Sequence, residues 1–245
     1  MRGTLAVASR VLQSIRGDRP TLALVLGVPI FIIFLFSRIL DEVPAGGINT
    51  DFIRPILLGF FVYFLTYVVT AIGFLRERQT GTLERVLASP VTRSGLVLGY
   101  LLGYGALVTV QAAVLLGSGV FFLGIKFQHG IGFFFGLELL GAFSALGLGI
   151  FASLFAKNEF QVLQFIPLLI APQAILGGVF VPIEALPVYL EVPARAFPLT
   201  YLLKGMNYVV LGHGTSQDAL LAVAVLAGYT LVTLLLAALM VRRPF

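Results

Sequence analysis

The chain has 245 residues, of which 59% are hydrophobic and 11% charged, and its mean hydropathy is +1.03. A soluble globular domain carries about 25% charged residues, so this composition excludes a water-soluble fold. Lys and Arg outnumber Asp and Glu by 16 to 11, but they fall in short gaps between long apolar runs, a pattern typical of membrane topology rather than of nucleic-acid binding. The absence of cysteine excludes disulfides, thiolate metal sites and cysteine nucleophiles.

Long uncharged runs predict an all-α, polytopic integral membrane protein with six transmembrane helices. A helix that crosses a bilayer needs about 20 residues. Six spans with short loops fill the chain, so we expect a single domain over residues 1–245 with no room for a soluble catalytic domain. Five of the runs are free of charge and one contains only Glu138; they cover residues 21–37, 55–75, 94–125, 130–156, 160–183 and 219–241.

The N-terminal segment has two interpretations. Four arginines precede the first run, and residues 43–45 loosely resemble a cleavage site, as in a secretory signal peptide. The apolar run is longer than the usual core of about 7 to 15 residues in such a peptide, which favours an uncleaved helix. Residues 1–20 have an incomplete amphipathic pattern and predict an interfacial helix, whose basic residues would meet anionic lipid headgroups.

The distribution of charges predicts the orientation in the membrane. Basic loops are retained in the cytoplasm. Placing the N-terminus inside puts eleven cations on the cytoplasmic side (Arg2, Arg10, Arg16, Arg19, Arg76, Arg78, Arg85, Arg93, Lys157, Arg242 and Arg243) and five outside (Arg38, Arg54, Lys126, Arg195 and Lys204). We therefore expect a multi-pass protein of the cell membrane with both termini in the cytoplasm.

Residues 76–93 form a cytoplasmic connection between the second and third spans that is too elaborate for a turn. Gly81 can end the helix that leaves span two, Thr80 or Thr82 can cap a new one, and residues 89–90, Ser-Pro, can end it. The pattern predicts a short helix.

One face of this short helix is apolar. Leu83, Val86 and Leu87 stand at helical spacing, whereas Glu84 and Arg85 point elsewhere. A helix of about two turns is not stable alone in water, so this face needs a surface to dock on. The bilayer interface and a partner protein are both open as that surface.

Residues 181–218 form the outer connection between the fifth and sixth spans. Four prolines cut it into short pieces, and its uncharged stretch of thirteen residues is too short to cross the hydrocarbon. We expect re-entrant or interfacial helices at the outer end of any pathway.

A small set of residues is a candidate translocation path or outer gate. Glu138 is the one charged residue well inside a span, where a carboxyl is costly and suggests function; the alternative is a position near the outer headgroups, close to Lys126. The fifth span contributes polar residues beside prolines that free backbone carbonyls. The full set is Glu138, Gln164, Gln173, Phe180, Pro182, Pro198 and Tyr201.

Glycines recur at close spacing in two spans. Gly95, Gly99 and Gly103 leave one face of the third span bare, and the fourth span repeats the theme. Small residues at this spacing let helices approach closely, which favours packing surfaces over dimer contacts. The two histidines, His129 and His213, have no second ligand at metal spacing, so no metal site is predicted.

Two motifs resemble the membrane subunits of ABC type-2 exporters. The first is RERQTGTLERVLASP at residues 76–90, which is similar to the cytoplasmic loop after their second helix. The second is GGVFVPIEALP at residues 177–187 followed by FPLTY at 197–201, which is similar to their outer-loop signature. Three spans separate the two motifs, as in the family, so the resemblance covers essentially the whole chain.

The resemblance implies a six-helix permease that works with a separate ATP-binding cassette ATPase and pairs with a second permease, as a homodimer or with a paralogue, to export lipids, lipid-linked sugars, drugs or other substrates. Its coupling helix, residues 81–88, would be seated in a cleft of the ATPase. The residues implied in coupling are Arg76, Glu77, Arg78, Gly81, Thr82, Leu83, Glu84, Arg85, Val86 and Leu87, of which the charged ones would make the polar contacts.

The sequence has no Gly-x-x-x-x-Gly-Lys-Ser/Thr loop, so we expect ATP and Mg on the partner ATPase, no cofactor on this chain and no enzymatic activity of its own. Membrane lipids are expected partners, and nucleic acid is not. The rival hypothesis is a stand-alone secondary transporter or channel driven by an ion gradient, with Glu138 as the coupling carboxyl. Such transporters often contain inverted repeats, and none is visible here. The sequence does not identify the substrate.

Overall fold

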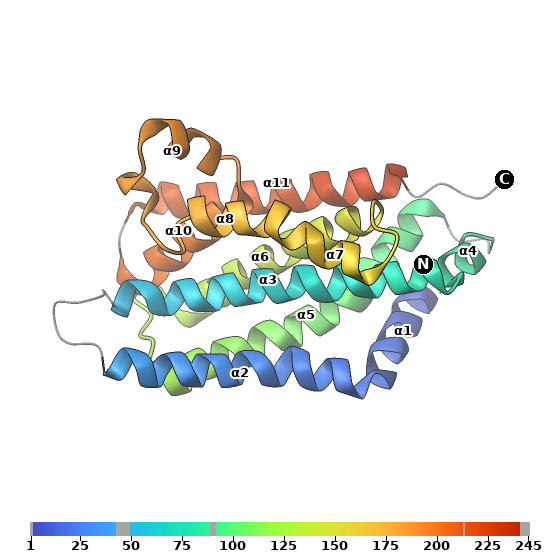
Figure 1. Ribbon diagram of the computed structural model, residues 1–245, viewed down its shortest axis with the longest axis horizontal. Coiled ribbons are helices and arrows are strands. Elements are labelled where there is room, and N and C mark those ends of the chain that lie inside the picture. Colours follow the sequence, from blue (N-terminus) through green and yellow to red (C-terminus); the bar gives the residue numbers. More distant parts are fainter. Residues whose placement is uncertain (1, 43–49, 89–91, 213, 241–245) are drawn as a thin grey trace.

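The computed structural model describes residues 2–42, 50–88, 92–212 and 214–240, and in these ranges the chain is helical without strands. Six helical spans lie roughly side by side along the long axis (Figure 1). They are α2 (Arg19–Asp41), α3 (Thr50–Gln79), α5 (Arg93–Leu123), α6 (Ile131–Ser153), the composite of α7 (Glu159–Phe165), η1 (Ile166–Ile170) and α8 (Ala171–Leu176), and α11 (Ser216–Met240). The prediction of an all-α protein with six spans is confirmed.

The N-terminal helix α1 (Arg2–Gly17) runs obliquely to α2 at one end of the bundle (Figure 1). Asp18 ends the first helix and caps the second, because its Oδ1 accepts a hydrogen bond from the Thr21 amide at 3.1 Å. The buried side of α1, with Val7 and Val11, packs against α5. The segment predicted to be interfacial is therefore a packed part of the bundle, and its position at the membrane surface stays a prediction.

Gly99 and Gly103 are the reason that α1 can approach α5 so closely. A Cβ atom at Gly99 would lie 2.6 Å from Cβ of Val7, and one at Gly103 would lie 2.6 Å from Cβ of Val11. Real Cβ contacts are never this short, so only glycine fits at either position. The stripe of small residues on the third span thus receives a helix of the same chain.

The helix α4 (Thr82–Leu87) lies in the connection between the second and third spans. It follows α3 after Thr80 and Gly81, and Gly81 has the left-handed conformation, at φ 68°. With 30 residues, α3 is about 45 Å long, which exceeds the hydrocarbon thickness of about 30 Å. The helix α4 consequently stands at the extremity of the bundle (Figure 1). We call this end, with α1 and α4, the α4 end.

The opposite end, here the α9 end, contains η2 (Ile183–Ala185), α9 (Val188–Ala194) and α10 (Pro198–Leu211). Most residues of α10 are buried, and it packs against α3, α6 and α11, so it re-enters the bundle without crossing it. In contrast, α9 projects from the bundle (Figure 1) with apolar side chains exposed, among them Val188 and Tyr189. Short helices are present in the segment where they were predicted, whereas their location on the outer side of the membrane stays a prediction.

The core lies where α3, α6, α10 and α11 meet, and glycines of α6 make these contacts close. Leu202 of α10 packs over Gly141, Thr233 of α11 over Gly147, and Thr70 of α3 over Gly149. Gly132 and Gly136 nearer the start of α6 have open space around them.

In the fifth span, Pro167 and Pro172 lie in or beside a π-helical turn, η1, since a proline leaves carbonyls without their usual donor.

Candidate functional site

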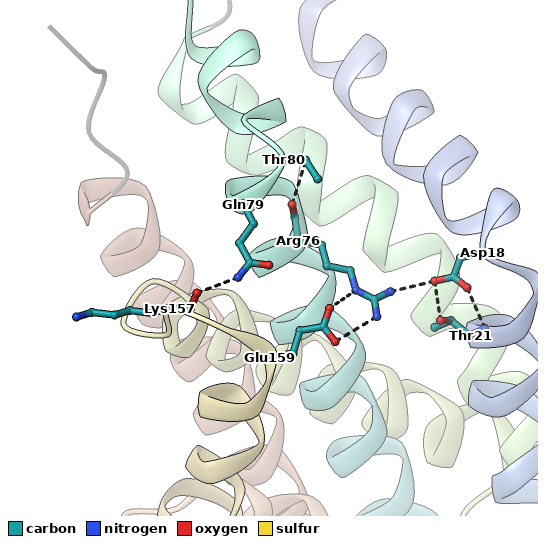
Figure 2. A network of polar contacts seen from close by, with 7 residues as sticks. All are labelled: Asp18, Thr21, Arg76, Gln79, Thr80, Lys157 and Glu159. Carbon is teal, nitrogen blue, oxygen red and sulfur yellow. Dashed lines mark hydrogen bonds and ion pairs between the residues drawn. The ribbon is translucent and has the colours of Figure 1, made fainter.

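The last turn of α3 holds four consecutive side chains that bond to other parts of the α4 end. Arg76 donates from Nε to Oε1 of Glu159 at 2.6 Å and from Nη1 to Oδ2 of Asp18 at 3.1 Å (Figure 2). Glu159 begins α7 and Asp18 caps α2, so Arg76 ties three spans together. These side chains are about half exposed, so the ion pairs add little to the free energy of unfolding. They fix the positions of the three spans relative to one another.

Glu77 faces the opposite way, into the bundle, with a side chain that is 9% exposed. Arg10 Nη2 of α1 donates to its Oε2 at 2.5 Å and to the Tyr100 hydroxyl of α5 at 3.0 Å. The Tyr100 hydroxyl donates to the same carboxylate oxygen. Burial alone would lower the pKa of Arg10, but the hydrogen bond and the charge of Glu77 raise it above its ordinary value.

Arg78 and Gln79 bond to backbone carbonyls at and beyond the end of α6. Arg78 Nη1 donates to the carbonyl of Ser153. Gln79 Nε2 donates to the carbonyl of Lys157 at 2.8 Å (Figure 2). The last carbonyls of a helix have no intrahelical donor and carry partial negative charge. A guanidinium there donates the missing hydrogen bond and places a positive charge beside these carbonyls. We call the contacts of residues 76–79 the α3 junction.

The α3 junction gives three of the predicted coupling residues partners within the chain. Arg76, Glu77 and Arg78 hold α1, α2, α5, α6 and α7 to the end of α3, and their contact with an ATPase stays a prediction. Sequence analysis missed their partners Asp18 and Glu159. A signal was available, because four acids, Asp18, Glu77, Glu84 and Glu159, lie on the side rich in cations.

Two residues of the apolar face of α4 pack on the chain itself. Leu83 is 7% exposed and belongs to the hydrophobic core, and Val86 is partly buried against that core, where α4 contacts α3 and α5. The chain's own helices thus provide a surface for Leu83 and Val86, and docking of α4 on the bilayer or on a partner stays a prediction. Glu84 and Arg85 are exposed, while the side chain of Leu87 and residues 89–90 lie outside the described residues.

At the α9 end, a cavity of about 450 Å³ lies between the start of α3, η2, α10 and the start of α11. Phe52, Glu184, Lys204 and Asp218 line it, and Lys204 Nζ is 2.8 Å from Oε1 of Glu184. Burial would raise the pKa of Glu184, but the hydrogen bond from Lys204, a backbone hydrogen bond and the charges of Lys204 and Arg195 together outweigh burial, so the pKa is lowered. No group of His, Asp and Glu suited to a metal ion occurs within the described ranges.

The profile of the ABC-2 type transporter family matches residues 2–211, which is most of the chain and includes both ends of the bundle. The chain belongs to the ABC-2 type transporter family. It is a multi-pass protein of the cell membrane.

Relatives of this ABC-2 protein include the "Probable multidrug ABC transporter permease YbhR" of Escherichia coli (strain K12), 26% identical over 140 residues that cover 57% of this chain and 38% of the relative. "Probable multidrug ABC transporter permease YbhS" of the same strain is 24% identical, covering 68% and 44%. "Linearmycin resistance permease protein LnrN" of Bacillus subtilis (strain 168) is 23% identical, covering 71% and 46%. The chain spans less than half the length of each.

The candidate path residues of the ABC-2 chain do not converge on one site. Glu138 is fully buried, and within the described residues neither carboxylate oxygen has a hydrogen-bond partner and no ion pair joins it to Lys126. Gln173 is buried and donates to the Leu169 carbonyl at 2.7 Å, whereas Gln164 is exposed.

The other four lie toward the α9 end, and of all seven only Pro182 lines the cavity there. Phe180 is exposed, Pro198 is buried, and Tyr201 donates to the Arg195 carbonyl at 2.9 Å.

Proposed function

We propose that this chain is the permease of an ATP-driven exporter and forms half of its translocation pathway. Membership of the ABC-2 family and the six spans support this function. The observation that carries the coupling mechanism is the α3 junction, because a displacement of α4 acts directly on α3, and the junction bonds α3 to five other helices.

We propose that the α4 end faces the cytoplasm, with both termini there. The positive-inside pattern supports this orientation, since eleven of the sixteen cations fall on that side. ATP hydrolysis would take place on a partner ATP-binding cassette ATPase, with ATP and Mg bound there and no cofactor on this chain. A second copy of the chain would complete the pathway.

The exposed residues of α4 are the proposed contact with the ATPase. Glu84 and Arg85 are directed away from the chain's core, and their opposite charges suit a polar contact. Leu83 and Val86 would act indirectly by fixing α4 on α3 and α5.

Charge reversal tests this contact. We expect Glu84→Arg combined with Arg85→Glu to abolish co-purification with the partner ATP-binding cassette ATPase, while the melting temperature of the permease is unchanged. Arg195→Glu, an exposed substitution at the α9 end, is the matched control and should leave capture intact. Undiminished capture by the double variant would refute the role of α4.

Reconstitution separates an ATP-driven permease from a secondary transporter. Proteoliposomes that contain this chain alone should show no flux under a proton gradient, and flux should require the ATPase with ATP and Mg. Gradient-driven flux without the ATPase would support the rival function. Relatives named for multidrug transport and for linearmycin resistance suggest amphiphilic drugs as the first substrates to assay by stimulated ATP hydrolysis.

A further inference from the structure

A second cavity, of about 580 Å³, opens between α1, α2, α3 and α5 at the α4 end. Ligand-binding cavities commonly measure about 300–1,000 Å³ and combine an apolar wall with a few polar groups. Here the polar groups are at the rim, with Arg10, Asp18 and Arg76, and the deep wall is aliphatic, with Val25, Leu65 and Val69. The cavity is therefore amphipathic along its length.

The depth of the cavity matches one leaflet of a bilayer. Leu65 precedes Arg76 by eleven residues on α3, which at a rise of ~1.5 Å per residue places it about 16 Å below the rim. Half of the hydrocarbon core measures about 15 Å. An acyl chain that starts at the rim would reach the end of the aliphatic wall near the middle of the membrane.

The four charged residues that line the cavity, Arg10, Asp18, Arg76 and Glu77, are balanced, and an excess of positive charge comes from two exposed arginines close to Asp18 in the sequence. Arg10 and Arg76 are compensated by Glu77, Asp18 and Glu159. Arg16 and Arg19, which flank the rim residue Asp18 in the sequence, are exposed, and neither has an ion-pair partner in the part of the chain that the structure describes.

Arg16 and Arg19 lie within two residues of Asp18, which lines this acyl-sized cavity, and they suit a phosphate ester because arginine donates paired hydrogen bonds to phosphate oxygens. We propose that this cavity is a binding site for an anionic phospholipid of the leaflet at the α4 end. One acyl chain lies between α2 and α3, and the headgroup phosphate lies against Arg16 and Arg19. The site is independent of the contact between α4 and an ATPase.

The absence of tryptophan from the chain permits a direct test. Leu65→Trp and, as a second cavity probe, Val69→Trp place a single fluorophore in the aliphatic wall. Each purified full-length variant is reconstituted in vesicles of phosphatidylcholine and phosphatidylglycerol, in which either one lipid or the other has brominated chains that quench tryptophan. Leu231→Trp, exposed on α11, reports on the ordinary lipid that surrounds the protein.

We expect the cavity probes to be quenched preferentially by phosphatidylglycerol, at a roughly fivefold lower mole fraction for each contributing arginine. Arg16→Gln with Arg19→Gln should remove the preference and leave the melting temperature unchanged, and the Leu231→Trp control should show none. Equal quenching by both lipids at the cavity probes, or no quenching there, would overturn the proposal.

Discussion

Arg10 and Glu77 form an ion pair between α1 and α3, with Nη2 and Oε2 2.5 Å apart, and the hydroxyl of Tyr100 is hydrogen-bonded to both partners. The partners are 67 residues apart in the sequence. This pair joins the N-terminal helix to the span that carries α4.

Removing both partners of this pair should cost less than the sum of removing each one alone. We expect Arg10→Leu to destabilise the protein by about 1–3 kcal/mol, because it leaves the buried Glu77 carboxylate with a hydroxyl as its remaining partner. The double variant with Glu77→Leu should be less destabilised than the sum of the two single changes. Thermal unfolding in detergent measures all three, and strictly additive effects would contradict the pairing.

Two glycines of α5 should respond in opposite directions to the same substitution. Gly99→Ala forces a methyl group to within 2.6 Å of Val7 and 2.9 Å of the Thr4 carbonyl, so we expect a loss of about 1–3 kcal/mol. Gly117→Ala meets no atom within 4 Å and should stabilise the helix by about 0.5–1 kcal/mol. Melting temperatures measure both, and similar shifts for the two would argue against the packing of α1 on α5.

The buried carboxyl of Glu138 should lower stability. Its oxygens have no hydrogen-bond partner among the residues described, and burying an unpartnered polar group costs on the order of 1–3 kcal/mol. We expect Glu138→Met, of similar length, to raise the melting temperature. ATP-driven flux in the reconstituted complex then shows whether the carboxyl serves transport. A stabilised variant that still transports would remove Glu138 from the pathway, and a fall in melting temperature would reveal a favourable interaction of this carboxyl.

Asp18 should make stability depend on acid pH. Hydrogen bonds from Thr21, followed by the charge of Arg76, lower its pKa below the ordinary value of 3.8. Its contribution is therefore complete above pH 3.8 and is lost as the pH falls through the lower pKa of the folded state. Asp18→Asn keeps an oxygen that can cap α2 but has no charge, so its melting temperature should fall below that of the wild type at pH 6 and converge with it in acid.

The parts of the fold that were predictable depend on local sequence. Long uncharged runs identified the six spans, and Gly81 identified the break before α4, because hydrophobic length and a left-handed residue act on their own segment. Periodicity also gave α4 an apolar face, but it cannot say which surface covers that face. Among the described residues of that face, Leu83 lies in the core of the bundle and Val86 packs against it.

The pairing within the α3 junction was beyond sequence reasoning for the same physical reason, although the acids on the cation-rich side were visible. Arg76 and Glu159 are 83 residues apart, and their contact exists only because α3 ends at the level where α7 begins. A charged residue near the end of a span has many available partners, including headgroups and water. Only the arrangement of the helices selects one.

The 30-residue helix α3 has α4 at one end and, near the other, Phe52 in the wall of the cavity at the α9 end. A rigid rod of about 45 Å that tilts by about 10° displaces its far tip by roughly 8 Å. This single helix is thus a lever long enough to join both faces of the membrane. A small tilt of α3 that begins at the α4 end would change the shape of the cavity at the α9 end directly, because the helix moves as one body and no chain of side-chain rearrangements is needed between the two ends.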